Sequence, residues 1–165
     1  MAIQKSSTKT ALELDNFESH VDKRLNSIFQ KLIKNQTTID ESISYALSNP
    51  GKRIRPTLVF LVGDFLGIEA SRLESVAGAI ELIHTYSLVH DDLPCMDDDD
   101  LRRGKPTLHK KFNESTAVLA GDALQTLAFN LILEDRNLDN TEKQELLSDL
   151  AKKIGPEGMV LGQNL

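Results

Sequence analysis

The sequence predicts an all-α fold in which long helices pack around a deep apolar cavity. Apolar residues recur at three- and four-residue intervals across residues 12–34 and 70–90, the spacing that places them on one face of a helix. Residues 58–66 and 116–133 are apolar on nearly all sides, which is typical of helices inside a bundle. No strand-like alternation competes with helix formation in residues 58–66.

The first half of the chain is expected to form helices after a disordered start. Residues 1–11 are polar and are predicted to be disordered. An amphipathic helix then covers residues 12–34, and a shorter one with a single apolar face covers residues 39–47. Turn residues at 48–51 end the shorter helix. Pro56 suits the first turn of the next helix, which we expect to be buried.

The helix over residues 70–90 has recognisable signals at both ends. Ser71 and Glu74 are spaced as a capping box at its start, and Pro94 bends or ends it. Because the chain must turn at Pro94, we expect Asp97 to swing back toward the end of the helix.

The C-terminal part of the chain predicts two further helices beyond residue 133. Thr141 and Gln144 are spaced as another capping box, and the helix they open stops at residues 155–156, a Gly-Pro pair. Residues 158–165 have the pattern of the first turns of another helix. The chain therefore has the composition of a helical bundle throughout.

Composition limits the function classes. The chain has 165 residues, of which 40% are hydrophobic and 27% charged, so it suits a soluble globular protein with one sizeable core. A net charge of −6 argues against nucleic-acid binding, whose footprint is basic. Cys95 is the only cysteine, which excludes an intramolecular disulfide and fits a reducing compartment. The first ten residues lack a signal peptide's apolar region, and no apolar run reaches 18 residues, so we predict a cytoplasmic protein without a membrane span.

Residues 91–107 contain six Asp and three Lys or Arg residues, a charge that no core can absorb. On a helix, His84, Asp91 and Asp92 fall at i, i+7 and i+8, so they share one face about two turns apart, roughly 10 Å. Asp91 and Asp97 would offer oxygen ligands from two backbone directions, as Mg²⁺ requires. The glycine and closing glutamate of an EF-hand loop are absent, which excludes that kind of site.

Cationic residues follow the acids at once: Arg102, Arg103 and Lys105. Metal-binding carboxylates beside fixed arginine donors suit a phosphate or diphosphate ligand. Lys52 and Arg55 lie at the start of the predicted helix after residue 51, where a helix N-terminus already attracts anions. The alternatives are a solvated acidic loop and a solvated basic turn, since charged runs are usually exposed surface.

Two motifs carry a resemblance to a known family. Residues 91–107 resemble the first aspartate-rich motif of the trans-isoprenyl diphosphate synthases, in the bacterial form with four residues between the acids, followed by LRRGKPT. The segment GKRIRP at residues 51–56 is similar to the family's isopentenyl diphosphate-binding element. The family usually has a second glycine where Pro50 stands. The resemblance covers the chain after about Leu12.

The resemblance implies an isoprenoid synthase-type helical bundle, with residues 12–165 as the N-terminal portion of a single domain whose C-terminal part is missing. It implies a head-to-tail prenyltransferase that condenses isopentenyl diphosphate with dimethylallyl or geranyl diphosphate. It also implies a homodimer that uses Mg²⁺. It implies that Asp91 and Asp97 bind the metal, and that these two act in catalysis with Asp92 and Arg102. It implies that Arg102 binds the allylic diphosphate. It implies that isopentenyl diphosphate is bound by Lys52, Arg55, His84 and Arg103.

Product length is the finest expectation. An aromatic residue five positions before the first aspartate marks the family's bacterial farnesyl enzymes, and Tyr86 stands there as a floor that would stop the product at fifteen carbons. On an ideal helix Tyr86 lies about 7.5 Å below Asp91 but about 140° round from it, while Ser87 is better aligned. The alternatives are a tyrosine that only packs between helices, and a geranylgeranyl diphosphate synthase.

Other functions share parts of this pattern. Terpene cyclases have the fold and an acidic motif, but they condense no second diphosphate and have no need of GKRIRP. The family's second aspartate-rich motif lies downstream, and nothing in these 165 residues matches it. We therefore expect the chain alone to be inactive, and a non-catalytic subunit that regulates a longer partner is the alternative. The length of the natural polypeptide would separate these two readings.

Overall fold

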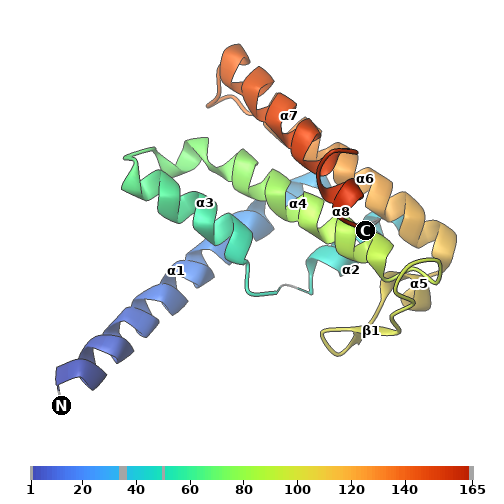
Figure 1. The fold of residues 1–165 in the computed structure, drawn as a ribbon, viewed down its shortest axis with the longest axis horizontal. Helices are drawn as coiled ribbons and strands as arrows, with labels where there is room; N and C mark the ends of the chain where they lie inside the picture. Colours follow the sequence, from blue (N-terminus) through green and yellow to red (C-terminus); the bar gives the residue numbers. More distant parts are fainter. Residues whose placement is uncertain (1, 34–36, 50, 164–165) are drawn as a thin grey trace.

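A computed structural model describes residues 2–33, 37–49 and 51–163, and it describes side chains from residue 17 onward within those ranges. Pro50 lies outside the described residues. The chain is helical, as predicted, with one very short β-hairpin (Figure 1). Its elements are α1 (Ala2–Leu32), α2 (Thr38–Leu47), α3 (Ile54–Phe65), η1 (Ala70–Arg72), α4 (Glu74–Asp91), β1 (Leu101–Arg102), β2 (Lys105–Pro106), α5 (Leu108–Lys111), α6 (Glu114–Leu133), α7 (Asn140–Ile154) and α8 (Met159–Gln163).

The core forms where α4 and α6 pack along each other, with α1, α2 and α3 around them. Small residues let the two central helices approach closely. A Cβ atom added at Gly121 of α6 would collide with the imidazole of His90 on α4, and one at Gly78 would lie 2.7 Å from Leu131. Leu82 and Leu124 are fully buried, and each such side chain contributes about 1.5–3 kcal/mol to the free energy of unfolding.

The apolar helices α3 and α6 are buried on one face only. Leu58, Val62 and Phe65 of α3 are 53%, 54% and 88% exposed, so the prediction that this helix is buried is wrong. Within residues 2–33, 37–49 and 51–163, α6 is the one helix long and apolar enough to cross a membrane by length and composition. A bundle helix has the same composition, and the buried face of α6 packs on α4.

Both predicted capping boxes are wrong. The segment before α4 is the short 3₁₀ helix η1, and α4 starts after Leu73 without a side-chain cap. The carboxylate of Glu74 instead forms an ion pair with Arg24 of α1. In α7 the box lies two residues earlier than predicted, with Asp139 as the N-cap and Glu142 bonding back to its backbone N–H.

The N-terminal helix is longer than the apolar pattern indicated. Helix α1 begins at Ala2, so it includes residues predicted to be disordered, and it ends at Leu32. Apolar periodicity could not reveal this start, because residues 2–11 carry almost no apolar face for a core to select. In Figure 1 this end of α1 extends away from the other helices.

Candidate active site

The C-terminal end of α4 turns the acidic segment back on itself. Helix α4 ends at Asp91, and Pro94 stands in the turn that follows. The backbone N–H of Asp97 donates a 2.8 Å hydrogen bond to the carbonyl oxygen of Asp91. Asp98 adopts a left-handed conformation with φ of 52° and donates its N–H to Leu93. The return of Asp97 toward Asp91 is thus present, as the position of Pro94 predicts.

Asp91 and Asp97 form a repulsive pair of carboxylates. Partial burial raises the pKa of Asp91, the charge of Asp97 raises it further, and Arg102 opposes both effects. Two such carboxylates suit a divalent cation, because Mg²⁺ is usually bound through one or two carboxylates plus water and substrate phosphates. No group of three or more His, Cys, Asp or Glu side chains in the described part of the chain could hold a metal ion by itself. The pair therefore fits the metal only as a partial ligand set.

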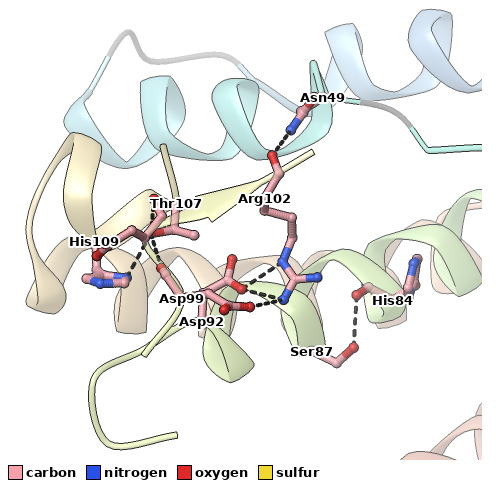
Figure 2. A network of polar contacts seen from close by, with 9 residues as sticks. Asn49, His84, Ser87, Asp92, Asp99, Arg102, Thr107 and His109 are labelled. Carbon is pink, nitrogen blue, oxygen red and sulfur yellow. Dashed lines mark hydrogen bonds and ion pairs between the residues drawn. The ribbon is translucent and has the colours of Figure 1, made fainter. Parts of the chain in front are cut away.

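Asp92 differs from its neighbour because it is buried and already bonded. Its side chain is 3% exposed, and its Oδ1 accepts a 2.7 Å hydrogen bond from Arg102 Nε. Arg102 also reaches Asp99 at 3.4 Å through Nη2. Figure 2 shows both carboxylates beside the guanidinium group. In this structure Asp92 is therefore a buried partner of Arg102, and its predicted part in catalysis stays a prediction.

The β-hairpin presents two arginines at its turn. Strands β1 and β2 are antiparallel, with Arg102 opposite Lys105. Arg103 and Gly104 between them both have positive φ, 54° and 76°, as a two-residue hairpin turn requires. The connection between α2 and α3 holds this turn: the side chain of Asn49 donates to the carbonyl of Arg102 at 3.0 Å (Figure 2). The backbone carbonyl of Asn49 accepts from Arg103 Nη1 at 2.8 Å. Sequence reasoning did not predict the hairpin.

The four residues predicted to bind isopentenyl diphosphate all line one cavity of about 530 Å³. These residues are Lys52, Arg55, His84 and Arg103. They come from the α2–α3 connection, α3, α4 and the hairpin turn, so only the folded chain brings them together. Gly51 lies beside them, and a Cβ atom there would be 2.5 Å from Arg103 Cζ. The absence of a side chain at Gly51 therefore lets the guanidinium group reach this position.

His84 lies among cations. Its pKa is lowered from 6.5, first by burial and next by the charge of Arg55, with smaller contributions from Arg103 and Arg102. Glu81, one turn earlier on α4, opposes this effect. The imidazole is therefore mainly neutral at pH 7 and can donate one N–H to an anion.

Sequence reasoning missed Arg53 and Glu81, which also line this cavity. Arg53 is 6% exposed and Glu81 4%, and Arg53 Nη1 donates to Glu81 Oε1 at 2.6 Å. A signal was available: Glu81 is the single charged residue in residues 75–83 of a largely apolar helix, and a buried carboxylate needs a paired cation. Arg53, next to Lys52, was the nearest unassigned arginine in the basic segment.

A second, mainly apolar cavity of about 470 Å³ begins beside Asp91 and runs along α4. Tyr86, Ser87 and His90 line it from α4, and Val118 and Met159 line it from α6 and α8. Tyr86 is only 7% exposed, and its ring packs edge-on against that of His90 with 5.7 Å between centroids. Tyr86 and Ser87 thus both line this cavity, and the role of Tyr86 as a chain-length floor stays a prediction.

Comparison with known proteins identifies relatives of this chain. Residues 36–163 match the sequence profile of the polyprenyl synthetase family. The chain is 46% identical to a farnesyl diphosphate synthase of Haemophilus influenzae, over 93% of this chain and 52% of that protein. It is 44% identical to a farnesyl diphosphate synthase of Escherichia coli, with the same two coverages.

Solved structures give the same result for the fold. A crystal structure of an FPP/GFPP synthase from Zymomonas mobilis superposes with a TM-score of 0.89 at 41% identity, covering 93% of this chain and 57% of that one. The chain thus spans about half the length of the curated relatives it matches. A profile match over most of the chain, together with close superposition on an isoprenoid synthase, shows that the chain belongs to the polyprenyl synthetase family.

Proposed function

We propose that these residues are the N-terminal half of a Mg²⁺-dependent prenyltransferase that joins isopentenyl diphosphate to dimethylallyl or geranyl diphosphate and forms farnesyl diphosphate. One observation carries the proposal. Arg103 of the hairpin turn lines the cationic cavity with Lys52, Arg55 and His84, while its neighbour Arg102 acts on the charge of Asp91, which is paired with Asp97. A cluster of cations and a metal-binding pair of carboxylates that meet at one hairpin suit two diphosphate substrates.

The cationic cavity would hold isopentenyl diphosphate. Lys52, Arg55 and Arg103 supply positive charge, and guanidinium groups can bind phosphate oxygens in pairs. Neutral His84 adds one N–H donor without a further charge. Together these residues would orient the substrate so that its double bond faces the second cavity.

The acidic side would hold the allylic diphosphate. When bound there, Mg²⁺ would stabilise the negative charge that develops on the departing diphosphate. Asp91 and Asp97 would hold the metal, and Arg102, fixed by Asp92, would place its guanidinium group beside the same oxygens. The apolar cavity along α4 would take the hydrocarbon tail and exclude water, which otherwise traps an allylic cation as an alcohol.

Binding of isopentenyl diphosphate to the 165-residue chain tests the cationic cavity directly by isothermal titration calorimetry. We expect Lys52→Met and Arg55→Met each to weaken binding at least tenfold, because each removes a charged partner of the diphosphate. Lys143→Met on α7, which removes an equal charge outside the cavity, should leave binding unchanged. Equal affinities for all these proteins would contradict the proposal.

We expect prenyl transfer to need catalytic residues in addition to those of the 165-residue chain. The relatives are about twice as long, and one acid pair is a partial metal site, so we expect no prenyl transfer by the purified chain. Transfer by that chain, free of any longer synthase, would show that the catalytic residues are complete. Stimulation of a longer synthase by the inactive chain would instead favour a regulatory subunit. The homodimer, the cytoplasmic location and the single-domain assignment stay predictions.

A further inference from the structure

Arg53 is a buried cation at the entry to α3, and its contacts come from separate parts of the fold. Its guanidinium group donates to Glu81 of α4 at 2.6 Å, to Asp22 of α1 at 3.2 Å and to the carbonyl oxygen of Leu47 at the end of α2 at 3.1 Å. It also lies over the ring of Phe29, 5.9 Å from the centroid. The side chain thus joins α1, α2 and α4 at the point where α3 begins.

The backbone of Arg53 is in a left-handed conformation, with φ of 47° and ψ of 32°. Residues other than glycine rarely adopt this conformation unless their surroundings enforce it. The Arg53 side chain does not cap α3, and the Arg53 carbonyl accepts the first helical hydrogen bond, from Thr57 N–H at 3.0 Å. The other hydrogen bonds of Arg53 are those of its buried side chain to α1, α2 and α4, and they connect this strained backbone position to the rest of the fold.

This left-handed residue sets the direction of the cations on either side of it. Lys52 precedes the turn in the connecting segment, and Arg55 lies in the first turn of α3, yet both line the same cavity. An ordinary helical or extended φ at residue 53 would rotate one of them relative to the other. Glu81, the ion-pair partner of Arg53, lies three residues before His84 on α4. The Arg53–Glu81 pair therefore connects the left-handed residue to the helix that carries His84.

We propose that Arg53, anchored by Glu81, is a positioning residue: it holds the left-handed turn that places Lys52 and Arg55 on one diphosphate. This inference rests on the proposed function of the cavity. The bland alternative is that the pair only contributes to stability. The two readings differ in what happens when both charges are removed, because replacing a buried ion pair with apolar residues often leaves stability intact.

Two double variants of the 165-residue chain separate these readings. Arg53→Met with Glu81→Leu removes the Arg53–Glu81 ion pair, which we call the clamp, and fills the space with apolar side chains. Arg53→Gly with Glu81→Leu removes the clamp and leaves a cavity. Glycine favours the left-handed conformation that methionine disfavours. We expect the Met variant to be the more stable of the two and yet to bind isopentenyl diphosphate at least tenfold more weakly than the unmodified chain. The Gly variant should be less stable and should bind more tightly than the Met variant.

The matched control removes an ion pair far from the cavity. Arg72 of η1 and Glu142 of α7 form such a pair, so Arg72→Met with Glu142→Leu should leave the affinity unchanged. Arg53→Lys, which keeps one donor for Glu81, should retain more affinity than the Met variant. Affinity that follows stability, with the Met variant binding as well as or better than the Gly variant, would overturn the positioning role.

A failure of the proposed function would look different. The unmodified chain would then bind no isopentenyl diphosphate, or Arg55→Met would not weaken binding. The clamp is tested in that case by nuclear magnetic resonance, since the backbone coupling and chemical shifts at residue 53 report its φ. We expect the Gly variant to keep the left-handed conformation and the Met variant to lose it. A Met variant that keeps it would overturn the clamp, whatever the cavity binds.

Discussion

Single residues decide whether the cationic cavity can form, and Gly51 shows this most simply. Its missing side chain is the space into which the Arg103 guanidinium group projects. A methyl group at residue 51 would push away the flexible end of an arginine, which costs little stability, and would not collide with backbone. The substitution should instead lower the affinity of the cavity for an anion.

We therefore predict that Gly51→Ala weakens isopentenyl diphosphate binding by about tenfold, or about 1.4 kcal/mol, while the unfolding midpoint in urea changes little. Calorimetry and urea denaturation measure the two quantities. Gly162→Ala is the matched control, because a Cβ atom there has nothing within 4 Å. Normal affinity in Gly51→Ala would show that Arg103 does not bind the diphosphate.

His84 reports the charge of the cavity. Burial and Arg55 lower its pKa from 6.5 in the folded chain, so the unfolded chain binds the proton more tightly. The stability that follows from this difference is present above pH 6.5 and is lost as the pH falls below that value. We predict that isopentenyl diphosphate raises the His84 pKa, because a bound anion favours the imidazolium form. Imidazole titration by nuclear magnetic resonance checks this.

Arg55→Met provides the control for that titration. It removes a charge that lowers the His84 pKa, so the pKa should rise without ligand, and added isopentenyl diphosphate should then change it less. A ligand that leaves the His84 pKa unchanged in the unmodified chain would place the diphosphate elsewhere.

Asp91 and Asp97 should matter for turnover and hardly at all for folding. In a protein that carries these residues together with the remaining length of the family, we predict that Asp91→Ala or Asp97→Ala lowers turnover by orders of magnitude. Neither carboxylate contributes to the apolar core. Helicity by circular dichroism should stay unchanged, as it should in the control Asp149→Ala. A tenfold loss of turnover corresponds to a rise of ~1.4 kcal/mol in the activation free energy. A smaller loss than this at saturating Mg²⁺ would contradict metal binding by these residues.

At the scale of elements, α4 connects every part of the candidate site. It carries Glu81 and His84 at the cationic cavity, Tyr86 at the apolar cavity and Asp91 at its end. Tyr86 is buried, with its ring against that of His90. The apolar cavity along α4 is therefore where the length of a growing isoprenoid chain would be limited.

We predict that Tyr86→Ala, in a protein with the family's full length, extends the products from farnesyl to geranylgeranyl diphosphate or beyond, because it opens volume beside an apolar path. Ser87→Phe, which adds volume to the same cavity, should shorten them. Chromatography of the dephosphorylated products measures both changes. An active Tyr86→Ala enzyme that still stops at fifteen carbons would mean that another residue sets the limit.

The sequence predicted those elements whose signal is local. The end of α4 before Pro94 and the return of Asp97 follow from backbone chemistry, and both are present. The start of α4 could not be predicted in this way, because Glu74 could bond either to Ser71 or to a distant cation. In the structure it forms an ion pair with Arg24 of α1. The lone carboxylate Glu81 signals a buried ion pair, but the sequence does not say which cation pairs with it, since the carboxylate partners of Arg53 lie 28 and 31 residues away.

Across the whole molecule, the exposed face of α3 is the feature that the sequence misjudged. Apolar residues on all sides predicted burial, but Leu58, Val62 and Phe65 have no cover among the described residues. Composition states how much apolar surface a helix has, whereas burial also depends on which other segments are there to pack on it.

We predict that the 165-residue chain binds an apolar dye such as anilinonaphthalene sulfonate at this face, and that it self-associates at high concentration. Leu58→Glu with Val62→Glu should lower both the dye fluorescence and the apparent mass in sedimentation without loss of helicity. Charge added on α7, as Ser148→Glu, is the control and should change neither quantity. Dye binding that persists in the double variant would locate the apolar surface elsewhere.

The pairing of Arg102 with Asp92 has a consequence for the entropy of binding. A free arginine loses up to about 2 kcal/mol of rotamer entropy when it becomes ordered on a ligand. Here Nε and Nη2 already donate to carboxylates in the folded chain, so that loss occurs during folding. If a diphosphate binds here, as proposed, it would meet a guanidinium group that is already ordered, and its binding enthalpy would not be offset by ordering this side chain. The free energy of folding would then carry part of the entropic cost of recognising that diphosphate.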